Sequence, residues 1–399
     1  MKFRYIASQA DGRVVEGDID VQNVQDVLSF LAKNNLKPVS VKSSEEEKGG
    51  LFKGSITITD EIFLTKYLAL MLRIGTGLLE AINILIADFK KPAIRDLLFE
   101  VRATLEQGQP FYSAFAKHPK VFDAVYINLV RAGEESGNLD KILTDLTESL
   151  SKKKDLQDTV RGALIYPIIL FIGSFGILFF LVMFALPKVA NVFMEGGFKT
   201  PPFSQVVFTV GLFFNNYGFY IIGFFGLLVV TAIILRARVP LFRKFLSNVF
   251  VNLPLISGVL KKMALQRFAS TLAALIKAGM PLTRALDITA DAVAHAELRD
   301  ALINISKEGL AKGLTIGEAF RRESAFPSTI TNLVAISEKA GHLDEVLTTV
   351  SEFYTKEIDA SVKELVSFLE PALLVFIGAI VAVIALAIIV PIYQLTTQF

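Results

Sequence analysis

The sequence contains the same pattern twice, 204 residues apart. Asn128-Leu129-Val130 recurs as Asn332-Leu333-Val334, and Gly137-x-Leu139-Asp140 recurs as Gly341-x-Leu343-Asp344. Between positions 128 and 144, nine of seventeen residues are identical at this offset. A repeat of fixed period indicates two copies of one structural unit. Each copy ends in a long apolar run, so the repeated unit is a helical domain with its own membrane helix.

Three charge-free runs are long enough to cross a bilayer, which takes roughly 20 apolar residues. They predict transmembrane helices over residues 162–187, 217–235 and 371–393, and we expect Asn215-Asn216 to interrupt the second apolar run. Residues 188–216 then form an external loop. The chain is 52% hydrophobic, which leaves about half of it for aqueous domains.

Basic residues indicate the orientation, because they are enriched on the cytoplasmic side. Seven basic residues and no acidic one occur between Arg236 and Phe268, and Lys152, Lys153 and Lys154 precede the first span. No charge follows Glu370, and the N-terminus lacks the apolar core of a signal peptide. We therefore expect the N-terminus and both large domains in the cytoplasm and the C-terminus outside.

The remaining pattern is predominantly helical. The predicted fold is an all-α integral membrane protein with two homologous cytoplasmic helical bundles, three transmembrane helices and a small N-terminal α+β unit. Gly108 and Gly313 are 205 residues apart, which suggests that the copies differ by one loop residue there. Outside the membrane we expect an α+β unit at residues 1–42, with a hairpin turn at Asp11-Gly12, then a linker at 43–56 and the first bundle at 57–160. A basic connector at 236–262 leads to the second bundle at 263–365.

The sharpest motif is Gly133-Glu134-Glu135-Ser136-Gly137-Asn138-Leu139. Gly137 fits the position just after a helix C-terminus. A carboxylate is disfavoured near that end of a helix, so Glu134 needs a positive partner, for which Arg131 is a candidate. The second copy keeps Glu338, Gly341 and Leu343 but has Ser337 in place of the first glycine. A structural helix corner and a partner-binding motif are both compatible with this pattern.

A Val-Val-Glu-Gly hairpin, a duplicated helical domain, the Gly-Glu-x-x-Gly-x-Leu motif and Tyr166-Pro167 at the first span occur together. In this combination the chain resembles the inner-membrane platform proteins of type IV pilus and type II secretion machines. The resemblance implies a multi-pass protein of the bacterial inner membrane that is not an enzyme. It also implies coupling of a cytoplasmic hexameric assembly ATPase to pilin or pseudopilin polymerisation.

The same resemblance implies further partners and a set of contact residues. The partners are other inner-membrane assembly proteins, a retraction ATPase in some systems and further copies of the chain, without nucleic acid or cofactors. The signature residues in partner contact would be Gly133, Glu134, Gly137, Leu139, Glu338, Gly341 and Leu343.

Other classes of function fit less well. No Gly-Lys pair occurs, so the chain has no Walker A loop, and its three histidines lack the spacing of a metal site. A small-solute transporter or a membrane scaffold unrelated to filaments is the alternative. Transporters usually carry ionisable residues inside the membrane, and the three predicted spans contain no Asp, Glu, Lys, Arg or His.

Pro167 and Pro371 lie where each bundle continues into its membrane helix. They are interpreted either as ordinary helix punctuation or as hinges. With hinges only at these points, rotation of a bundle would turn the membrane helix as a rigid lever. On this hypothesis Gly137→Val or Glu134→Arg abolishes filament assembly while the protein still inserts and accumulates.

Overall fold

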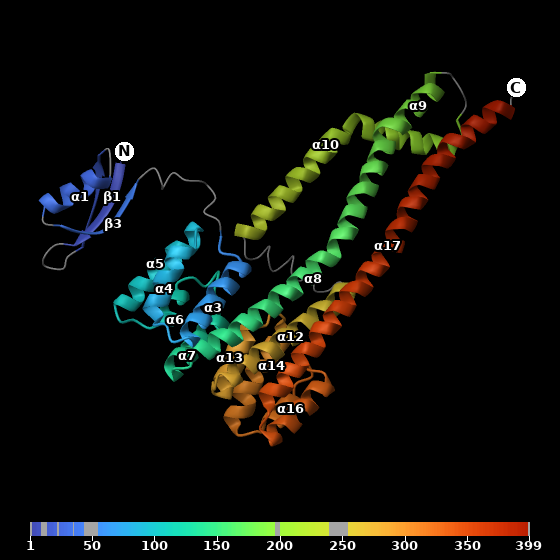
Figure 1. Ribbon diagram of the computed structural model, residues 1–399. Coiled ribbons are helices and arrows are strands. Elements are labelled where there is room, and N and C mark those ends of the chain that lie inside the picture. The colour runs from blue at the N-terminus through green and yellow to red at the C-terminus, as the bar shows by residue number, and fades with distance from the viewer. Residues whose placement is uncertain are drawn as a thin grey trace. The chain divides into compact units, whose positions relative to one another are not determined.

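The computed structural model describes residues 2–8, 14–21, 24–34, 36–43, 55–195, 200–238 and 254–397 (Figure 1). The chain divides into two units. One comprises Met1–Thr57 and Ile86–Phe99, and the other comprises Ile58–Leu85 and Glu100–Phe399. The second unit contains the motifs and the apolar helices.

The N-terminal segment forms a three-stranded antiparallel sheet with one helix. The strands β1 (Lys2–Ser8), β2 (Val14–Asp20) and β3 (Lys37–Ser43) are ordered β2-β1-β3. Helix α1 (Val24–Lys33) buries Val27 and Leu31, which pack with Ile19, Val21 and Leu36. The expected turn at Asp11-Gly12 lies outside the described residues.

The first copy of the repeat contains six helices among its described residues: α3 (Ile58–Arg73), α4 (Leu78–Asp88), α5 (Pro92–Glu106), α6 (Phe111–Ala116), α7 (Ala124–Ser136) and α8 (Leu139–Phe180). Its core is an aromatic cluster of Phe111, Phe115, Phe122 and Tyr126, whose adjacent ring centroids are 4.8–5.5 Å apart. The Tyr126 hydroxyl is 3.1 Å from that of buried Thr65. A buried tyrosine hydroxyl needs such a partner.

The second copy follows the same plan: α12 (Pro254–Lys277), α13 (Leu282–Ala292), α14 (Ala296–Asn304), the π-helical segment η2 (Ile305–Gly309), the 3₁₀ turn η3 (Leu310–Lys312), α15 (Ile316–Arg321), α16 (Ser328–Ala340) and α17 (Leu343–Thr397). Its aromatic cluster is Phe268, Phe320 and Phe326. Tyr126 becomes Ile330, while Leu64 becomes Phe268. One large ring has therefore moved from α7 to α12, which keeps the core filled.

The repeat is also visible in the backbone. Six glycines in the described part of the chain have positive φ, and they form three corresponding pairs: Gly75 and Gly279, Gly108 and Gly313, Gly137 and Gly341. Each ends a helix in the left-handed conformation that glycine adopts without steric cost. The predicted duplication is therefore present in the structure.

The prediction that the two copies differ by one loop residue near Gly108 and Gly313 is wrong. The extra residue of the second copy does not lie in a loop, because the backbone forms the π segment η2 where the first copy has the uninterrupted helix α5. A π turn holds one residue more than an α turn. Phe122 and Phe326 are again 204 residues apart. The turn before α16 is therefore one residue shorter than the turn before α7.

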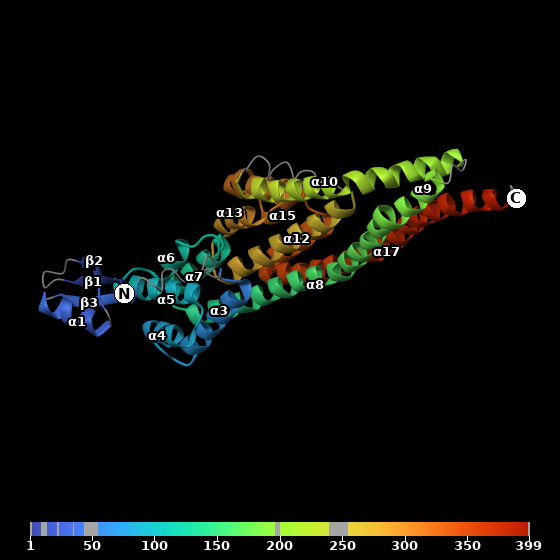
Figure 2. The same cartoon turned by 90° about the horizontal axis from the view of Figure 1, so that it is seen from above.

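Three helices among the described residues are long and apolar enough to cross a membrane, as predicted. The first is α8, which continues through the π segment η1 (Leu181–Ala185) into α9 (Leu186–Glu195). The second is α10 (Pro202–Arg238), and the third is α17. Helices α8 and α17 run side by side in both views (Figures 1 and 2). Each passes through its proline without a break, which confirms the predicted continuity from bundle to membrane helix.

Two helices begin earlier in the chain than expected. Helix α10 begins at Pro202 and continues through Asn215-Asn216, so most of the expected loop 188–216 is helical. Asparagine costs a helix only tenths of a kcal/mol, whereas proline suits the first helical position. Helix α12 begins at Pro254, inside the expected connector 236–262, of which residues 239–253 are not described. Lys262, within the helical part of the expected connector, donates to Glu357 and Ser361 of α17, each at 2.8 Å.

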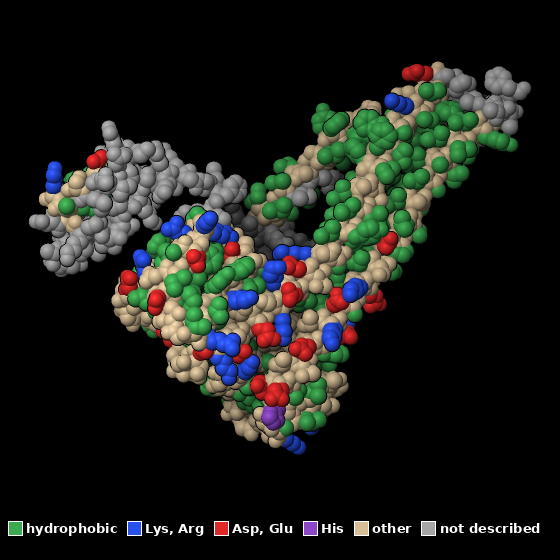
Figure 3. All heavy atoms as spheres, in the orientation of Figure 1, with side chains coloured by type: hydrophobic (Ala, Val, Ile, Leu, Met, Phe, Trp, Pro, Cys, Tyr) green, Lys and Arg blue, Asp and Glu red, His purple; other side chains and the backbone are tan. Residues whose placement is uncertain are grey.

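The apolar helices meet in a small core of their own. Leu186, Ala190 and Phe193 of α9 pack with Phe208 of α10 and Ile384 of α17. Gly211 permits the close approach of α10, since a Cβ there would lie 2.7 Å from Leu186. Hydrophobic side chains cover these helices, whereas charged side chains gather on the bundles (Figure 3).

Candidate functional site

The signature motif forms the corner between α7 and α8. The Gly137 N–H donates to the Glu134 carbonyl at 3.2 Å, and the Asn138 N–H donates to the Gly133 carbonyl at 2.9 Å. This pair of bonds is the Schellman arrangement, which requires a left-handed residue, and Gly137 has φ +71°. Gly341 and His342 make the same two bonds to Glu338 and Ser337.

The signature glutamate of each copy binds the start of a neighbouring helix. Both Glu134 carboxylate oxygens accept backbone N–H groups of α6, from Phe111 at 2.6 Å and Tyr112 at 3.1 Å. In the second copy Glu338 accepts from Ile316 at 2.6 Å and Gly317 at 2.8 Å. The first N–H groups of a helix lack partners within it, and the helix dipole favours negative charge there. The carboxylate therefore fastens α7 to α6, and α16 to α15.

Arg131 is not the partner of Glu134, contrary to expectation. Its guanidinium binds the neighbouring Glu135 at 2.7 Å and lies 5.2 Å from the centre of the Tyr112 ring. The i−3 spacing could not reveal a backbone partner 23 residues earlier in the chain.

The first glycine of the motif marks a close helix contact. A Cβ at Gly133 would lie 3.0 Å from Cβ and Cγ1 of Ile142 on α8. The second copy has Ser337 here and the smaller Val346 in place of Ile142. The Ser337 hydroxyl donates to the Val334 carbonyl at 3.0 Å. In the second copy the larger Ser337 thus occurs together with the smaller Val346.

The sequence-predicted residues accordingly gather in two corners. Gly133, Glu134, Gly137 and Leu139 lie in the first, and Glu338, Gly341 and Leu343 in the second. Leu139 and Leu343 are the first residues of the long helices α8 and α17.

The two bundles are joined by ion pairs that the sequence analysis did not anticipate. Arg267 binds Asp123 at 2.6 Å, and Lys277 binds Asp145 at 2.9 Å. Lys152 lies 3.4 Å from Glu352. Asp123 also caps α7 by accepting the Tyr126 N–H at 3.0 Å. Lys152, one of the basic residues before the first span, therefore also links the two bundles.

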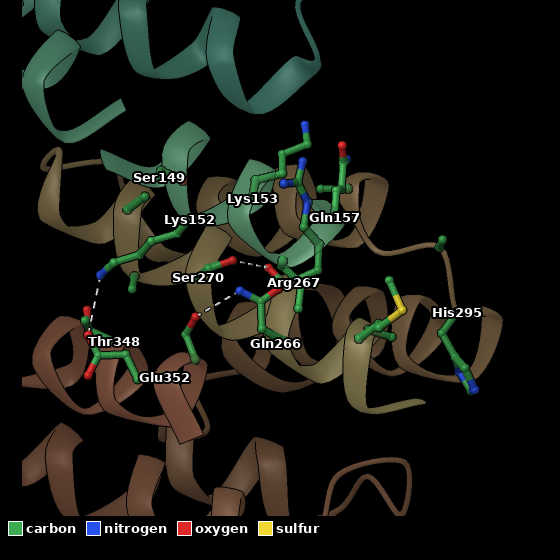
Figure 4. Close-up of a pocket in the computed structure, with 18 of the residues that line it drawn as sticks. Ser149, Lys152, Lys153, Gln157, Gln266, Arg267, Ser270, His295, Thr348 and Glu352 are labelled. Carbon is green, nitrogen blue, oxygen red and sulfur yellow. Dashed lines mark hydrogen bonds and ion pairs between the residues drawn. The ribbon is translucent and has the colours of Figure 1, made fainter. Parts of the chain in front are cut away.

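A cavity of about 1100 Å³ lies between α8 of the first bundle and α12 and α17 of the second. Figure 4 shows Lys152 reaching across it to Glu352, while Gln266 of α12 bonds Ser351 of α17 at 3.2 Å. Arg267 and Lys153 extend in the same direction in this view. The lining mixes acidic and basic side chains, so it does not define one class of ligand.

One buried acid lies beside this interface. Glu61 of α3 is only 6% exposed, and its burial raises its pKa from 4.5 to about 7, although Lys153 lowers it. Asp123 raises it further, and Arg267 lowers it. The folded protein therefore retains the Glu61 proton up to about neutral pH.

We expect Glu61→Gln to change how stability depends on pH. Between about pH 4.5 and 7 the unfolded chain loses the Glu61 proton while the folded chain keeps it, so wild-type stability falls as pH rises. Above pH 7 buried Glu61 ionises in the folded protein, and the free energy of unfolding is then lower by about 3 kcal/mol than at acidic pH. Thermal unfolding should show the variant more stable than wild type at pH 8 and similar to it at pH 4.5. An exposed control, Glu106→Gln, should show no such divergence. An equal difference at both pH values would contradict the assignment.

The predicted hinges are linked to each other. The Tyr166 hydroxyl donates to Glu370 Oε1 at 3.0 Å. These residues immediately precede Pro167 and Pro371 and correspond at the repeat offset. The sequence held a signal for this contact, since Glu370 is the last charge of the chain and aligns with a tyrosine.

The fold and its paired corners define a duplicated helical-bundle membrane protein in which each bundle shares a helix with a membrane span. The family described as "Type II secretion system (T2SS), protein F" matches residues 64–187 and 268–391. The chain belongs to this family, and each match begins within the first helix of a bundle and ends in or next to the apolar span.

Relatives with two kinds of name align over nearly the full length. The type IV pilus assembly protein PilC of Myxococcus xanthus is 30% identical, over 99% of this chain and 95% of the relative. PilC of Thermus thermophilus is 29% identical, over 98% of each chain. The type II secretion system protein F of Pseudomonas aeruginosa is 27% identical, also over 98% of each.

Proposed function

We propose that this chain is the inner-membrane platform of a type IV pilus or type II secretion machine. In this role it couples a cytoplasmic assembly ATPase to the polymerisation of pilin or pseudopilin. The proposal is supported by the full-length similarity to pilus assembly and secretion proteins. No feature of the described residues favours the alternative of a small-solute transporter or unrelated scaffold.

The observation that carries the mechanism is the continuity of α8 and α17. Each helix is the closing helix of a bundle and also a membrane span. A helix of 42 residues is about 63 Å long, since the rise is 1.5 Å per residue. A turn imposed on a bundle would therefore reach the membrane without passing through a flexible linker. Pro167 and Pro371, linked through Tyr166 and Glu370, would set where the two helices bend together.

The proposed topology places both bundles and the N-terminus in the cytoplasm, and the C-terminus outside. Reporter fusions test it directly. Alkaline phosphatase fused after Phe399 should be active, and a cytoplasmic reporter fused there should not. A protease site inserted at 196–199 should be cut from the outside. A cytoplasmic C-terminus would overturn this topology.

The proposed platform is not a catalyst. The purified full-length protein should hydrolyse no nucleotide by itself, and it should alter the turnover of its cognate ATPase when the two are mixed. The pair should co-purify from membranes together with either pilin or pseudopilin, which would distinguish the two machines. Intrinsic nucleotide hydrolysis that persisted after removal of contaminants would overturn the platform assignment.

A further inference from the structure

The two copies of the repeat differ in what covers their first helix. One side of α12 in the second copy carries residues that are buried or half-buried: Arg267, Thr271, Ala274 and Ala278. Arg267 binds Asp123 of the first bundle, and Ala274 lines the cavity against α8. The corresponding residues of α3 in the first copy have no such cover.

The uncovered face is also the more apolar one. The α3 residues at the same positions are Phe63, Tyr67, Leu70 and Ile74, which are 48%, 46%, 54% and 73% exposed. Their spacing of four, three and four residues makes a single stripe along one side of the helix. We call this stripe the α3 face. A contiguous apolar patch on an aqueous domain marks a site of association.

The opposite side of the second copy is uncovered in the same way. The first bundle contacts the second through α7 and α8, where Leu129 is 4% exposed. The corresponding residue on α16 is Leu333, at 38% exposure. Half-buried Ala132 corresponds to Ile336, which is 67% exposed. Ser149, an exposed residue that lines the cavity between the bundles, corresponds to Phe353, which is 56% exposed. We call Leu333, Ile336 and Phe353 the α16–α17 face.

The internal contacts can be transposed by 204 residues to ask whether the two open faces fit each other. Arg267 with Asp123 becomes Phe63 with Pro327, an apolar pair. Glu352 with Lys152 becomes Glu148 with Lys356, which again pairs opposite charges between exposed residues. Lys277 with Asp145 becomes Arg73 with Thr349, a donor and an acceptor. None of the three transposed pairs sets like charges together.

We propose that the α3 face of one chain packs against the α16–α17 face of a second copy of the chain, repeating between chains the interface that joins the two bundles within one chain. A second copy is the natural occupant because the chain already builds this interface once. The contact is heterologous, since each chain offers two different surfaces.

The direction of the membrane helices constrains the resulting assembly. Helices α8 and α17 are corresponding parts of the two copies and run side by side in the same direction (Figures 1 and 2). The operation that relates the copies therefore preserves the direction across the membrane. Repeating that operation between chains turns each chain about an axis along the membrane normal, so the chains form a ring if the repeated rotation closes. The inference goes beyond the proposed function, because it holds whichever filament is built.

A mixing experiment with the full-length protein in nanodiscs tests the proposal. Leu70→Asp disrupts the α3 face, and Ile336→Asp disrupts the α16–α17 face. Each variant alone should associate at least about tenfold more weakly than wild type, because the interface would bury an unpaired charge. The two variants mixed should form a one-to-one dimer, since each retains the face that the other needs. Lys307→Asp, an exposed change on η2, should associate like wild type.

Two results of this experiment would overturn the proposal. One is wild-type association by both variants, and the other is a mixture that stays monomeric while wild type associates. Native mass spectrometry gives the stoichiometry, and circular dichroism confirms that each variant is folded.

A crosslinking experiment distinguishes the other possible occupants of the α3 face. The chain has no cysteine, so Phe63→Cys provides a single thiol for a benzophenone maleimide. Irradiating a mixture of isotopically labelled and unlabelled chains should attach this residue to peptides from 327–356 of another chain. Attachment to 58–85 of another chain would indicate a two-fold dimer, and attachment to 2–43 of the same chain would assign the face to the N-terminal sheet. Either of these two results would overturn the proposal.

Discussion

Glu134→Arg should destabilise the first bundle and abolish filament assembly. The substitution removes the carboxylate that accepts the Phe111 and Tyr112 N–H groups, and it places a positive charge at the positive end of α6. Losing two charge-assisted hydrogen bonds should lower the free energy of unfolding by about 3 kcal/mol or more. Domains are stable by only about 5–15 kcal/mol, so both the melting temperature and the accumulation of this variant should fall. This replaces the expectation from the lever hypothesis that the variant still accumulates, because the carboxylate holds two helices of the bundle together.

The neighbouring residue supplies a matched control. Glu135 lies on the same helix turn but bonds exposed Arg131, so Glu135→Arg should have a small effect on stability. Glu134→Gln, which keeps one acceptor oxygen, should fall between the two. Melting of the purified protein and immunoblots of membranes measure stability and accumulation, and pilus or secretion assays measure assembly. Normal melting of Glu134→Arg would contradict the role of the carboxylate as a helix fastener.

Gly137→Val should lower the free energy of unfolding by a similar amount, because it strains the backbone. Gly137 has φ +71°, where a β-branched side chain is strongly disfavoured, and no neighbouring atom lies within 4 Å of the position of a Cβ. The cost is therefore conformational strain, about 2–3 kcal/mol, and not a clash. Gly341→Val should behave alike in the second bundle, since Gly341 has φ +76°.

Replacing Gly137 with asparagine tests whether the defect comes from backbone strain or from the loss of a partner contact. Gly137→Asn should restore most of the stability, because asparagine tolerates the left-handed conformation. If Gly137→Asn melts like wild type but fails to assemble filaments, the exposed corner contacts a partner. Recovery of assembly along with stability would indicate a purely structural corner. A Gly137→Val variant with unchanged melting temperature would contradict the strain argument.

Features with local sequence signals were predictable. The left-handed glycine after α7 and the helical continuity through Pro167 and Pro371 follow from residues close together in the chain. The period of 204 residues follows from comparison of the sequence with itself. Helix ends have compact signatures, and long apolar runs have few alternatives.

Features that depend on distant contacts were missed. The partner of Glu134 is the backbone of Phe111, and backbone groups have no side-chain signature. The link between Arg267 and Asp123 joins residues 144 positions apart on different bundles. The prediction of a helix break at Asn215-Asn216 rests on propensity alone, and contacts of α10 with α9 and α17 outweigh such a weak preference.

The π segment η2 accommodates the one-residue difference between the two copies of the repeat. An α-helix that gains a residue must either shift every later side chain by about 100° or absorb the extra residue in a wider turn. The second copy shows the wider turn, and the connection before Pro327 is one residue shorter. The difference is thus confined to one stretch, and Glu338 accepts the N–H groups of Ile316 and Gly317 as Glu134 accepts those of Phe111 and Tyr112. Over this stretch the two copies differ by one residue that is gained and one that is lost, and they keep the same fastening of one helix to the next.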